Sequence, residues 1–328
     1  MSSTRVVLAA ILLLVVGFAY FHKSKDKDSS VPEFISEQLV TLAPIQELAV
    51  EKVAVESSAP VATIVSHSDD SKLPKDVDLM TQLFQPYPPL LPIVKTVDYK
   101  SRVDWLIGRA AYLGDYASHF KTSKHFISRS LHGMGQYLSD AVSKGDRFNV
   151  LDPDKKIEFH LVLDLSRLKM WAYYYDVDTD KRGLLKSYHV CAGRLDPTTA
   201  SGSLTPFGTF MLGNEIAVYN DDSPGTRFGE QIKMISVFGK RWIPLSREVA
   251  GCTAGCKGLG IHGTPWLTNE QTGELYEDRS CIGQYLSSGC VRLLSEDIEE
   301  IFSVIVSRPS YMHVVKDFVD ANLPGCEA

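Results

Sequence analysis

The spacing of hydrophobic residues changes along the chain, and each change marks a boundary. Val6–Phe21 is an uncharged apolar run of 16 residues, and residues 22–97 then show no sustained period. Approximate helical spacing follows, and short alternating runs that predict β-strands come after it. We therefore expect five segments: a membrane segment at 1–21, a disordered tether at 22–97, a helical region at 98–146, a mostly β domain at 147–318 and a tail at 319–328.

The apolar run at the N-terminus indicates the compartment. A helix needs roughly 17 to 25 residues to span a bilayer, and flanking side chains can extend a run of marginal length. Arg5 precedes the run, and the bulky Tyr20 and Phe21 disfavour cleavage after Ala19. We therefore prefer an uncleaved inner-membrane anchor to a secretory signal peptide. Either interpretation places the rest of the chain in the periplasm, where thiols can be oxidised.

The next two segments differ in composition and period. Residues 22–97 are rich in Ser, Pro and charged residues, which is typical of a disordered connection. Within residues 98–146, the spacing of Ile127, Leu131, Met134 and Leu138 predicts amphipathic helices.

The fourth segment, at residues 147–318, consists mainly of short hydrophobic runs separated by residues typical of turns. The runs are IEFHLVLDL, KMWAYYYD, KSYHVCAG, FGTFMLG, RWIPL and SYMHVV. Many short strands of this kind predict a mostly β sandwich or barrel. One helix is inserted, because Ser295 can cap a segment with Ile298, Ile301 and Phe302 on one face.

Composition and charge exclude several functions. The chain has 328 residues, with 34 Lys and Arg against 40 Asp and Glu, so its formal net charge is −6. Without a long basic run, no nucleic-acid partner is expected. No phosphate-binding loop or dinucleotide-binding glycine motif is present, so no organic cofactor is expected either.

Two turns flanked by glycine carry candidate chemistry. The first, GLGIHGTPW, brings His262 to the end of a strand beside Gly263, and the second, SSGCVRL, places Gly289 before Cys290. A free thiol has a pKa of about 8.5, so a nucleophilic cysteine needs a base such as imidazole and a group that orients this base. The carbonyl of Gly263 is the nearest candidate for that orienting group. Amide groups converging near Gly289 and Cys290 would form an oxyanion hole.

Other roles for the cysteines remain open at this point. Cys252, Cys256, His262 and Cys281 could ligate zinc, but the first pair has three intervening residues and no second closely spaced pair exists. We therefore expect no metal. A single disulfide between two of Cys252, Cys256 and Cys281 is expected ahead of a zinc site. Cys191 is predicted to be a buried apolar thiol.

The two turns also resemble a known family. The stretches LGIHGTP and IGQYLSSGCVRLLSEDIEEIF are similar to the L,D-transpeptidase (YkuD) catalytic domain. LVLDLSRLKMWAYY, with a D-x-S turn, LTPFGTFML and RWIPL resemble further elements of that family in the same order. The resemblance covers about residues 147–318 and implies an L,D-transpeptidase-like β sandwich.

The resemblance assigns roles to individual residues. It implies that Cys290 is the nucleophile, that His262 donates and accepts the proton, and that the Gly289 and Cys290 amides hold the oxyanion. Arg292 would either bind the substrate carboxylate or brace the loop, and Ser288 stands where many members have histidine. Two segments are longer than the family's usual pattern, between His262 and Cys290 and at residues 213–240.

The implied activity is that of a peptidoglycan L,D-transpeptidase, which acts in cell wall biogenesis and cell shape. Cys290 would form a thioester with a tetrapeptide stem, release D-Ala and transfer the acyl group to an amine of another stem. Two alternatives use the same residues differently. One is a hydrolytic cysteine peptidase (L,D-carboxypeptidase) of the cell wall, and the other is a non-catalytic envelope-binding protein.

Overall fold

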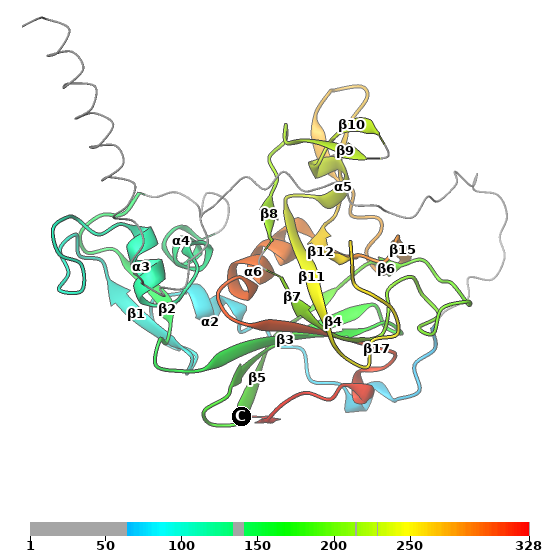
Figure 1. Cartoon of the computed structure of the whole chain (residues 1–328), viewed down its shortest axis with the longest axis horizontal. Coiled ribbons are helices and arrows are strands. Elements are labelled where there is room, and N and C mark those ends of the chain that lie inside the picture. The colour runs from blue at the N-terminus through cyan, green and yellow to red at the C-terminus, as the bar shows by residue number, and fades with distance from the viewer. Residues whose placement is uncertain (1–63, 134–140, 214, 228, 328) are drawn as a thin grey trace, which may run out of the picture. The chain divides into compact units, whose positions relative to one another are not determined.

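A computed structural model describes residues 64–133, 141–213, 215–227 and 229–327 (Figure 1). The expected membrane segment at 1–21 and the tether as far as residue 63 lie outside the described residues. Among the helices within the described ranges, none is long and apolar enough to cross a membrane.

One ten-stranded mixed sheet organises the domain. Its path runs β16 (Val291–Leu293), β12 (Gly260–Gly263), β11 (Arg241–Ala250), β7 (Gly208–Leu212), β17 (Ser310–Val315), β3 (Ile157–Asp164), β4 (Lys169–Asp176), β5 (Lys181–His189) and β18 (Cys326–Glu327), with β8 (Ala217–Val218) paired to β11. The pairs β12–β16, β17–β3 and β18–β5 are parallel. The mostly β class is confirmed.

The sequence predicted a sandwich of two sheets, whereas the main strands form one continuous sheet. Strand β11 explains this difference. Its first half pairs with β12 and its second half with β7, so it joins both parts of the sheet. The pairing with β7 shifts register after Leu245 and again after Glu248. Because such irregularities bend a strand and increase its twist, the sheet curls instead of splitting into two layers.

The predicted helix is present and covers the apolar face of this sheet. It is α6 (Ser295–Ile305), which connects β16 to β17. Strand β17 in turn pairs in parallel with β3. Ile298, Ile301 and Phe302 are buried in one core with Phe159 and Leu161 of β3. The 3.6-residue period of the helix and the 2-residue period of the strand therefore point to the same core.

Residues 64–97 correct the expectation of a disordered tether that reaches residue 97. This stretch contains η1 (Asp70–Lys72), α2 (Met80–Phe84) and β1 (Val94–Asp98). Met80, Leu83 and Ile93 are buried in the same core as α6. Elements of three to five residues are too short to show a period, which is why the sequence pattern missed them.

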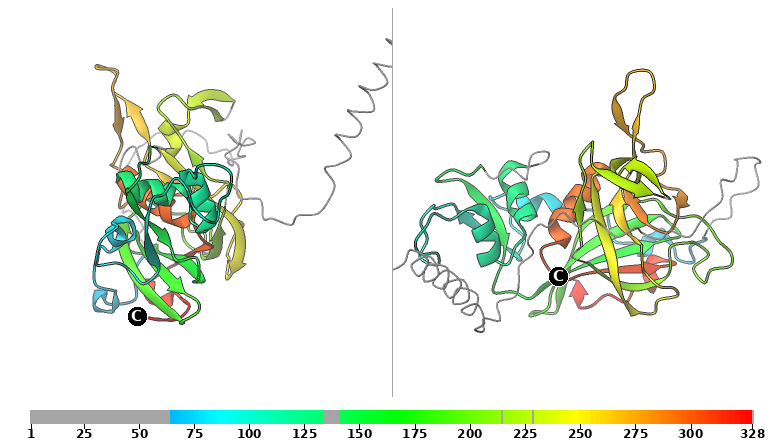
Figure 2. Two further views of the ribbon diagram at one scale, coloured as in Figure 1. Left: turned by 90° about the vertical axis from the view of Figure 1, so that its left-hand side faces the viewer. Right: turned by 45° about the horizontal axis from the view of Figure 1, so that its top comes forward.

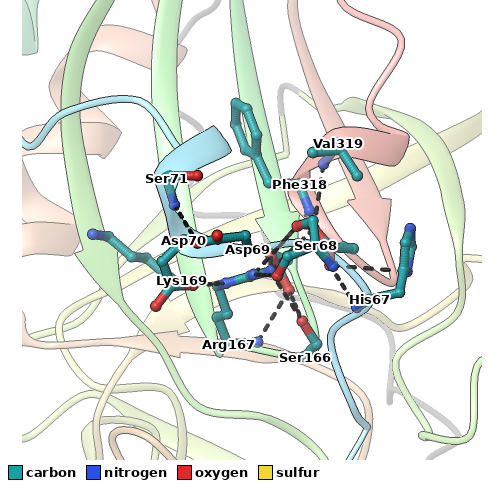
Figure 3. A network of polar contacts seen from close by, with 12 residues as sticks. His67, Ser68, Asp69, Asp70, Ser71, Ser166, Arg167, Lys169, Phe318 and Val319 are labelled. Atoms are coloured by element: carbon teal, nitrogen blue, oxygen red, sulfur yellow. Dashed lines mark hydrogen bonds and ion pairs between the residues drawn. The ribbon is translucent and has the colours of Figure 1, made fainter.

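Polar contacts hold the beginning of this stretch to the domain (Figure 3). The backbone N–H groups of His67 and Ser68 both donate to Asp317 Oδ2 at 2.9 Å. Arg167 donates to the Ser68 carbonyl at 2.8 Å and to Asp70 Oδ1 at 3.0 Å. Residues 67–70 are therefore an integral part of the fold.

Two helices occupy the predicted helical region. They are α3 (Leu113–His119) and α4 (Lys124–His132), and the expected positions Met134 and Leu138 lie outside the described residues. Strand β1 precedes these helices in the sequence and β2 (Arg147–Leu151) follows them, and the two strands pair with each other. Ser123, which caps α4, hydrogen-bonds the Ser303 carbonyl of α6 at 3.2 Å, so the helices attach directly to the β domain.

The longer segments at 213–240 and between His262 and Cys290 each contribute a hairpin (Figures 1 and 2). The hairpins are β9 (Pro224–Arg227) with β10 (Glu230–Lys233), and β13 (Trp266–Thr268) with β14 (Leu275–Glu277). The remaining elements are α5 (Ile235–Phe238), η2 (Phe318–Asp320) and the parallel pair β6 (Ala192–Gly193) and β15 (Tyr285–Ser287). The expected tail is not separate, since β18 adds to the main sheet.

Candidate active site

The pairing of β12 with β16 places the two candidate catalytic residues on one face. Ile261 pairs with Val291 and His262 with Arg292. Side chains alternate along strands, so Cys290, two residues before Arg292, shares the face of His262. The opposite face, with Ile261 and Val291, enters the core.

His262 is oriented by a backbone carbonyl and by aromatic rings. It is 2% exposed, and its Nδ1 lies 2.8 Å from the Gly263 oxygen. A carbonyl can only accept, so Nδ1–H donates to it and Nε2 of the neutral ring is left with its lone pair. Phe238 and Trp242 flank the ring at centroid distances of 5.2 and 5.8 Å. The imidazole is thus held as a base whose Nε2 can take a proton.

The loop before Cys290 needs glycine at position 289. Gly289 has φ of +118°, and a Cβ there would lie 2.9 Å from the Leu204 carbonyl oxygen. Its own carbonyl accepts the Thr205 hydroxyl at 2.9 Å. Thr205 belongs to the LTPFGTF element, so that element directly supports the loop of Cys290.

The amide of Gly289 corrects one expectation. It donates to Ser287 Oγ at 3.1 Å, and the Ser287 hydroxyl donates to the Cys290 carbonyl at 2.5 Å. Because the loop uses this amide internally, Gly289 acts through its conformation and does not direct its N–H at an oxyanion. Ser288 lies half-buried at the same turn, and Sγ of the 8% exposed Cys290 is 3.8 Å from the Gly258 carbonyl.

The longer segment 213–240 forms part of the surroundings of Cys290. Cys290 is buried in one cluster with Tyr219 and Trp242, and Met234 and Phe238 pack against it. Of these four neighbours, all but Trp242 come from the longer segment. The extra residues therefore build the apolar wall of the site. These neighbours of Cys290 were not predicted from the sequence. Only Trp242 lies in a motif that had been noted, RWIPL, and it pairs with His262 across adjacent strands.

The second hairpin is tied to the start of α6 by Glu277. Its Oε1 accepts the Ser295 N–H at 2.7 Å and also the Thr264 hydroxyl. Trp266 Nε1 donates to Ser295 Oγ at 3.1 Å. Ser295 therefore does not cap the helix as expected; the carboxylate of Glu277 satisfies an N-terminal amide instead. Thr264 follows Gly263 directly, so this anchor adjoins the group that orients His262.

Arg292 has contacts that brace the loop. Its backbone exchanges two hydrogen bonds with Cys191, at 2.9 and 3.0 Å. Its guanidinium lies close enough to Cys281 to influence the pKa of that thiol, while its buried Nε has no hydrogen-bond partner among the residues that the structure describes. Of the two roles weighed for Arg292, the contacts in this structure are those of the brace.

The thiols of Cys191 and Cys281 also perturb each other. The neighbouring Cys281 thiol lowers the pKa of Cys191, and the nearby Arg292 acts in the same direction. The Cys191 thiol, together with burial, raises the pKa of Cys281 far above its usual value. Cys191 is buried, as its strand position predicted, and it lies beside a second buried thiol.

The remaining cysteines do not form the alternative sites. Across the described ranges, no group of three His, Cys, Asp or Glu side chains is placed to hold a metal ion, so Cys252, Cys256, His262 and Cys281 are not gathered as a zinc site. All six cysteines are free thiols. The thiol beside Cys281 is Cys191, which lies outside the set in which a disulfide was expected.

A comparison with protein families identifies the domain that holds this geometry. Residues 158–315 match the family model described as the L,D-transpeptidase catalytic domain, YkuD. The chain carries a YkuD catalytic domain. This match confirms the family inferred from the sequence motifs, and the YkuD segment runs from β3 to β17 and includes both His262 and Cys290. No curated protein matches the chain.

Solved structures with a detectable likeness to the chain are distant from it. The helical cell shape determining protein Pgp2 from Campylobacter jejuni is 15% identical with a TM-score of 0.33, over 52% of this chain and 51% of that one. Bd1075 of Bdellovibrio bacteriovorus is 13% identical with a TM-score of 0.32, over 48% of each chain. The chain spans about half the length of the solved structures that it matches.

Proposed function

We propose that the chain is a peptidoglycan L,D-transpeptidase with Cys290 as its nucleophile. The observation that supports this most directly is the placement of Cys290 and His262 on one face of adjacent parallel strands, with His262 Nδ1–H bonded to the Gly263 carbonyl. A thiol and an oriented imidazole in that arrangement are the parts of an acyl-transfer site. The YkuD domain supports peptidoglycan as the substrate, and we propose that the stem peptide is the part that reacts.

The proposed reaction has two halves. His262 Nε2 takes the thiol proton, and the Cys290 thiolate attacks the carbonyl of the third stem residue. The bond to D-Ala breaks, His262 returns the proton to the leaving amine, and a thioester remains on Cys290. An amine of a second stem then attacks the thioester, His262 accepts its proton, and a cross-link forms as the thiolate is released.

The surroundings of Cys290 favour an amine acceptor over water. The cluster of Tyr219, Trp242, Met234 and Phe238 is apolar and excludes water from one side of the thioester. The substrate is a component of the cell wall, so the proposal places the domain in the cell envelope. The inner-membrane anchor expected at Val6–Phe21 would hold it there.

A product assay tests this function. The purified full chain is incubated with disaccharide tetrapeptide stems, and D-Ala, tripeptide and cross-linked dimer are measured by mass spectrometry. The proposal predicts D-Ala release together with dimers. It also predicts that Cys290→Ala and His262→Ala abolish both products, while Cys326→Ala at the exposed C-terminal strand retains them.

Other outcomes would overturn the proposal in distinct ways. D-Ala with tripeptide alone, even with excess acceptor stem, would identify a hydrolytic L,D-carboxypeptidase. If the wild-type chain forms neither product but binds purified cell wall tightly, it is a non-catalytic envelope protein. Full activity of Cys290→Ala would remove the nucleophile from the scheme.

A further inference from the structure

We propose that Cys191 and Cys281 are a redox pair whose disulfide staples the turn before the Cys290 loop to the end of β5. This site is separate from the nucleophile. Cys281 precedes Cys290 by nine residues in the sequence, Cys191 pairs with the backbone of Arg292, and acyl transfer needs neither thiol.

Backbone hydrogen bonds bring the two cysteines together. The Gly283 N–H donates to the Val190 carbonyl at 3.0 Å, and the Ala192 N–H donates to the Gln284 carbonyl at 3.2 Å. Residues 283–284 thus run alongside residues 190–192. Residues 281–284 form a turn, in which the Gln284 N–H donates to the Cys281 carbonyl at 3.1 Å.

The side chains continue this approach. Cys191 is 0% and Cys281 3% exposed, and the two thiols lie close enough to shift each other's pKa. Two buried thiols on neighbouring backbone segments that hydrogen bonds hold side by side can reach bonding distance by rotation of their side chains. The turn itself carries exposed residues at Ser280, Gly283 and Gln284, so opening it gives an oxidant access to Cys281 and Cys191.

The environment also prepares Cys191 to react. The Cys281 thiol and Arg292 both lower the pKa of Cys191, which favours the thiolate form of Cys191. Among attacking thiols, those with a pKa near the ambient pH react fastest in thiol–disulfide exchange. Cys281, whose pKa is raised, stays protonated until the second step.

The oxidation can be written with a small disulfide such as oxidised glutathione. The Cys191 thiolate attacks one sulfur, the S–S bond of the reagent breaks, and one small thiolate leaves. Cys281 then gives its proton to solvent and attacks the Cys191 sulfur, which displaces the second small thiolate. The protein loses two electrons, and two small thiols are formed with protons from solvent.

A consequence for Arg292 depends on the function proposed above. Arg292 lies close enough to Cys191 and Cys281 to favour the thiolate form of each, and disulfide formation removes both groups as partners for the guanidinium. Arg292 is then released from its brace and can turn toward a substrate carboxylate on the face of Cys290 and His262. The oxidised chain should therefore bind stems more tightly than the reduced chain.

The test of the pair itself does not require activity. The full chain with Cys290→Ala, which cannot use the nucleophile, is equilibrated in mixtures of reduced and oxidised glutathione, trapped with iodoacetamide, digested and mapped by mass. We expect a peptide linking Cys191 to Cys281, with a mass loss of about 2 Da in the intact chain. The link should disappear in Cys191→Ser and Cys281→Ser and persist in Cys252→Ser.

The contrary outcomes are equally specific. Free thiols or glutathione adducts alone at every mixture would overturn the proposal, as would a dominant Cys252–Cys256 link. In chains with intact Cys290, the Michaelis constant for stems should fall severalfold on oxidation and stay constant in Cys191→Ser. An inactive chain that still forms the link would contradict only the transpeptidase assignment.

Discussion

Gly289 shows how a single residue positions the chemistry of this domain. Its positive φ turns the chain so that Ser287, Thr205 and the Cys290 carbonyl close one hydrogen-bonded loop. A side chain at this position would meet both strain and a backbone atom of Leu204. The glycine is therefore needed for geometry, independently of any amide contribution.

Replacing Gly289 by alanine should reduce turnover of stem peptides on the order of 10²-fold, because displacing the thiol by about 1 Å is enough for such a loss. Gly273→Ala is the matched control, since Gly273 also has a positive φ, of +73°, but has nothing within 4 Å of an added Cβ. Product formation and thermal unfolding are measured for both. Equal losses of activity in the two variants would contradict the role of the close approach.

At the scale of elements, a buried histidine pair links three central strands. His160 Nδ1 of β3 lies 2.9 Å from His313 Nε2 of β17, and His313 Nδ1 lies 3.1 Å from the Thr209 hydroxyl of β7. Burial lowers the pKa of His160 to about 3 and that of His313 to about 4. Both rings are therefore neutral in the folded chain at neutral pH.

Acid should destabilise the fold through this pair. In the unfolded chain a histidine titrates near pH 6.5, so protons favour the unfolded state as the pH falls from about 6.5 to about 4. The loss should amount to a few kcal/mol, on the order of 1.4 kcal/mol per unit of pKa difference. Urea unfolding at several pH values measures it. His313→Gln should flatten the dependence in this window, whereas the exposed His189→Gln should leave it unchanged.

The hairpin β13–β14 depends on Glu277, where one carboxylate joins Thr264 and the start of α6. Glu277→Ala leaves a buried hydroxyl and an amide unsatisfied, so we expect a stability loss of about 1–3 kcal/mol. Turnover should fall about tenfold, because Thr264 adjoins the carbonyl that holds His262. Glu277→Gln keeps the accepting oxygen and should retain most activity. The exposed Glu274→Ala is the control, and an equal effect there would exclude the anchor.

For the whole molecule, the segment at residues 67–70 depends on one arginine. Arg167 contacts Asp164 at 2.7 Å and Asp317 at 3.0 Å, and both carboxylates are fully buried. Arg167→Ala would leave two buried charges uncompensated, which costs about 3–5 kcal/mol. Urea denaturation should show this loss, and limited proteolysis should cut near residues 67–70. Arg279→Ala, which breaks an exposed ion pair with Glu296, should change neither much.

Local pattern predicts those parts of the fold that local forces determine. The alternation in β3, the apolar face of α6 and the glycines beside His262 and Cys290 are all visible in short windows of sequence. The family motifs add the order of these elements. Sequence analysis could therefore name the two central residues of the candidate site.

Features that depend on distant contacts could not be predicted in this way. The parallel pairing of β12 and β16 brings together residues that are far apart along the chain. Cys191 meets Cys281 only because residues 190–192 lie beside the turn at 281–284. Glu277 replaces Ser295 at the start of α6 for the same reason, since a hairpin separate from the helix supplies the carboxylate.

The central claim is that Cys290 carries the acyl group of a stem peptide. The most direct measurement is the intact mass of the full chain, quenched in acid during turnover of a disaccharide tetrapeptide and then digested to locate the adduct. The account predicts the mass of the stem without its terminal D-Ala, attached at Cys290, removed by hydroxylamine and missing in Cys290→Ala. An adduct on another residue, or D-Ala release by Cys290→Ala at the wild-type rate, would contradict it.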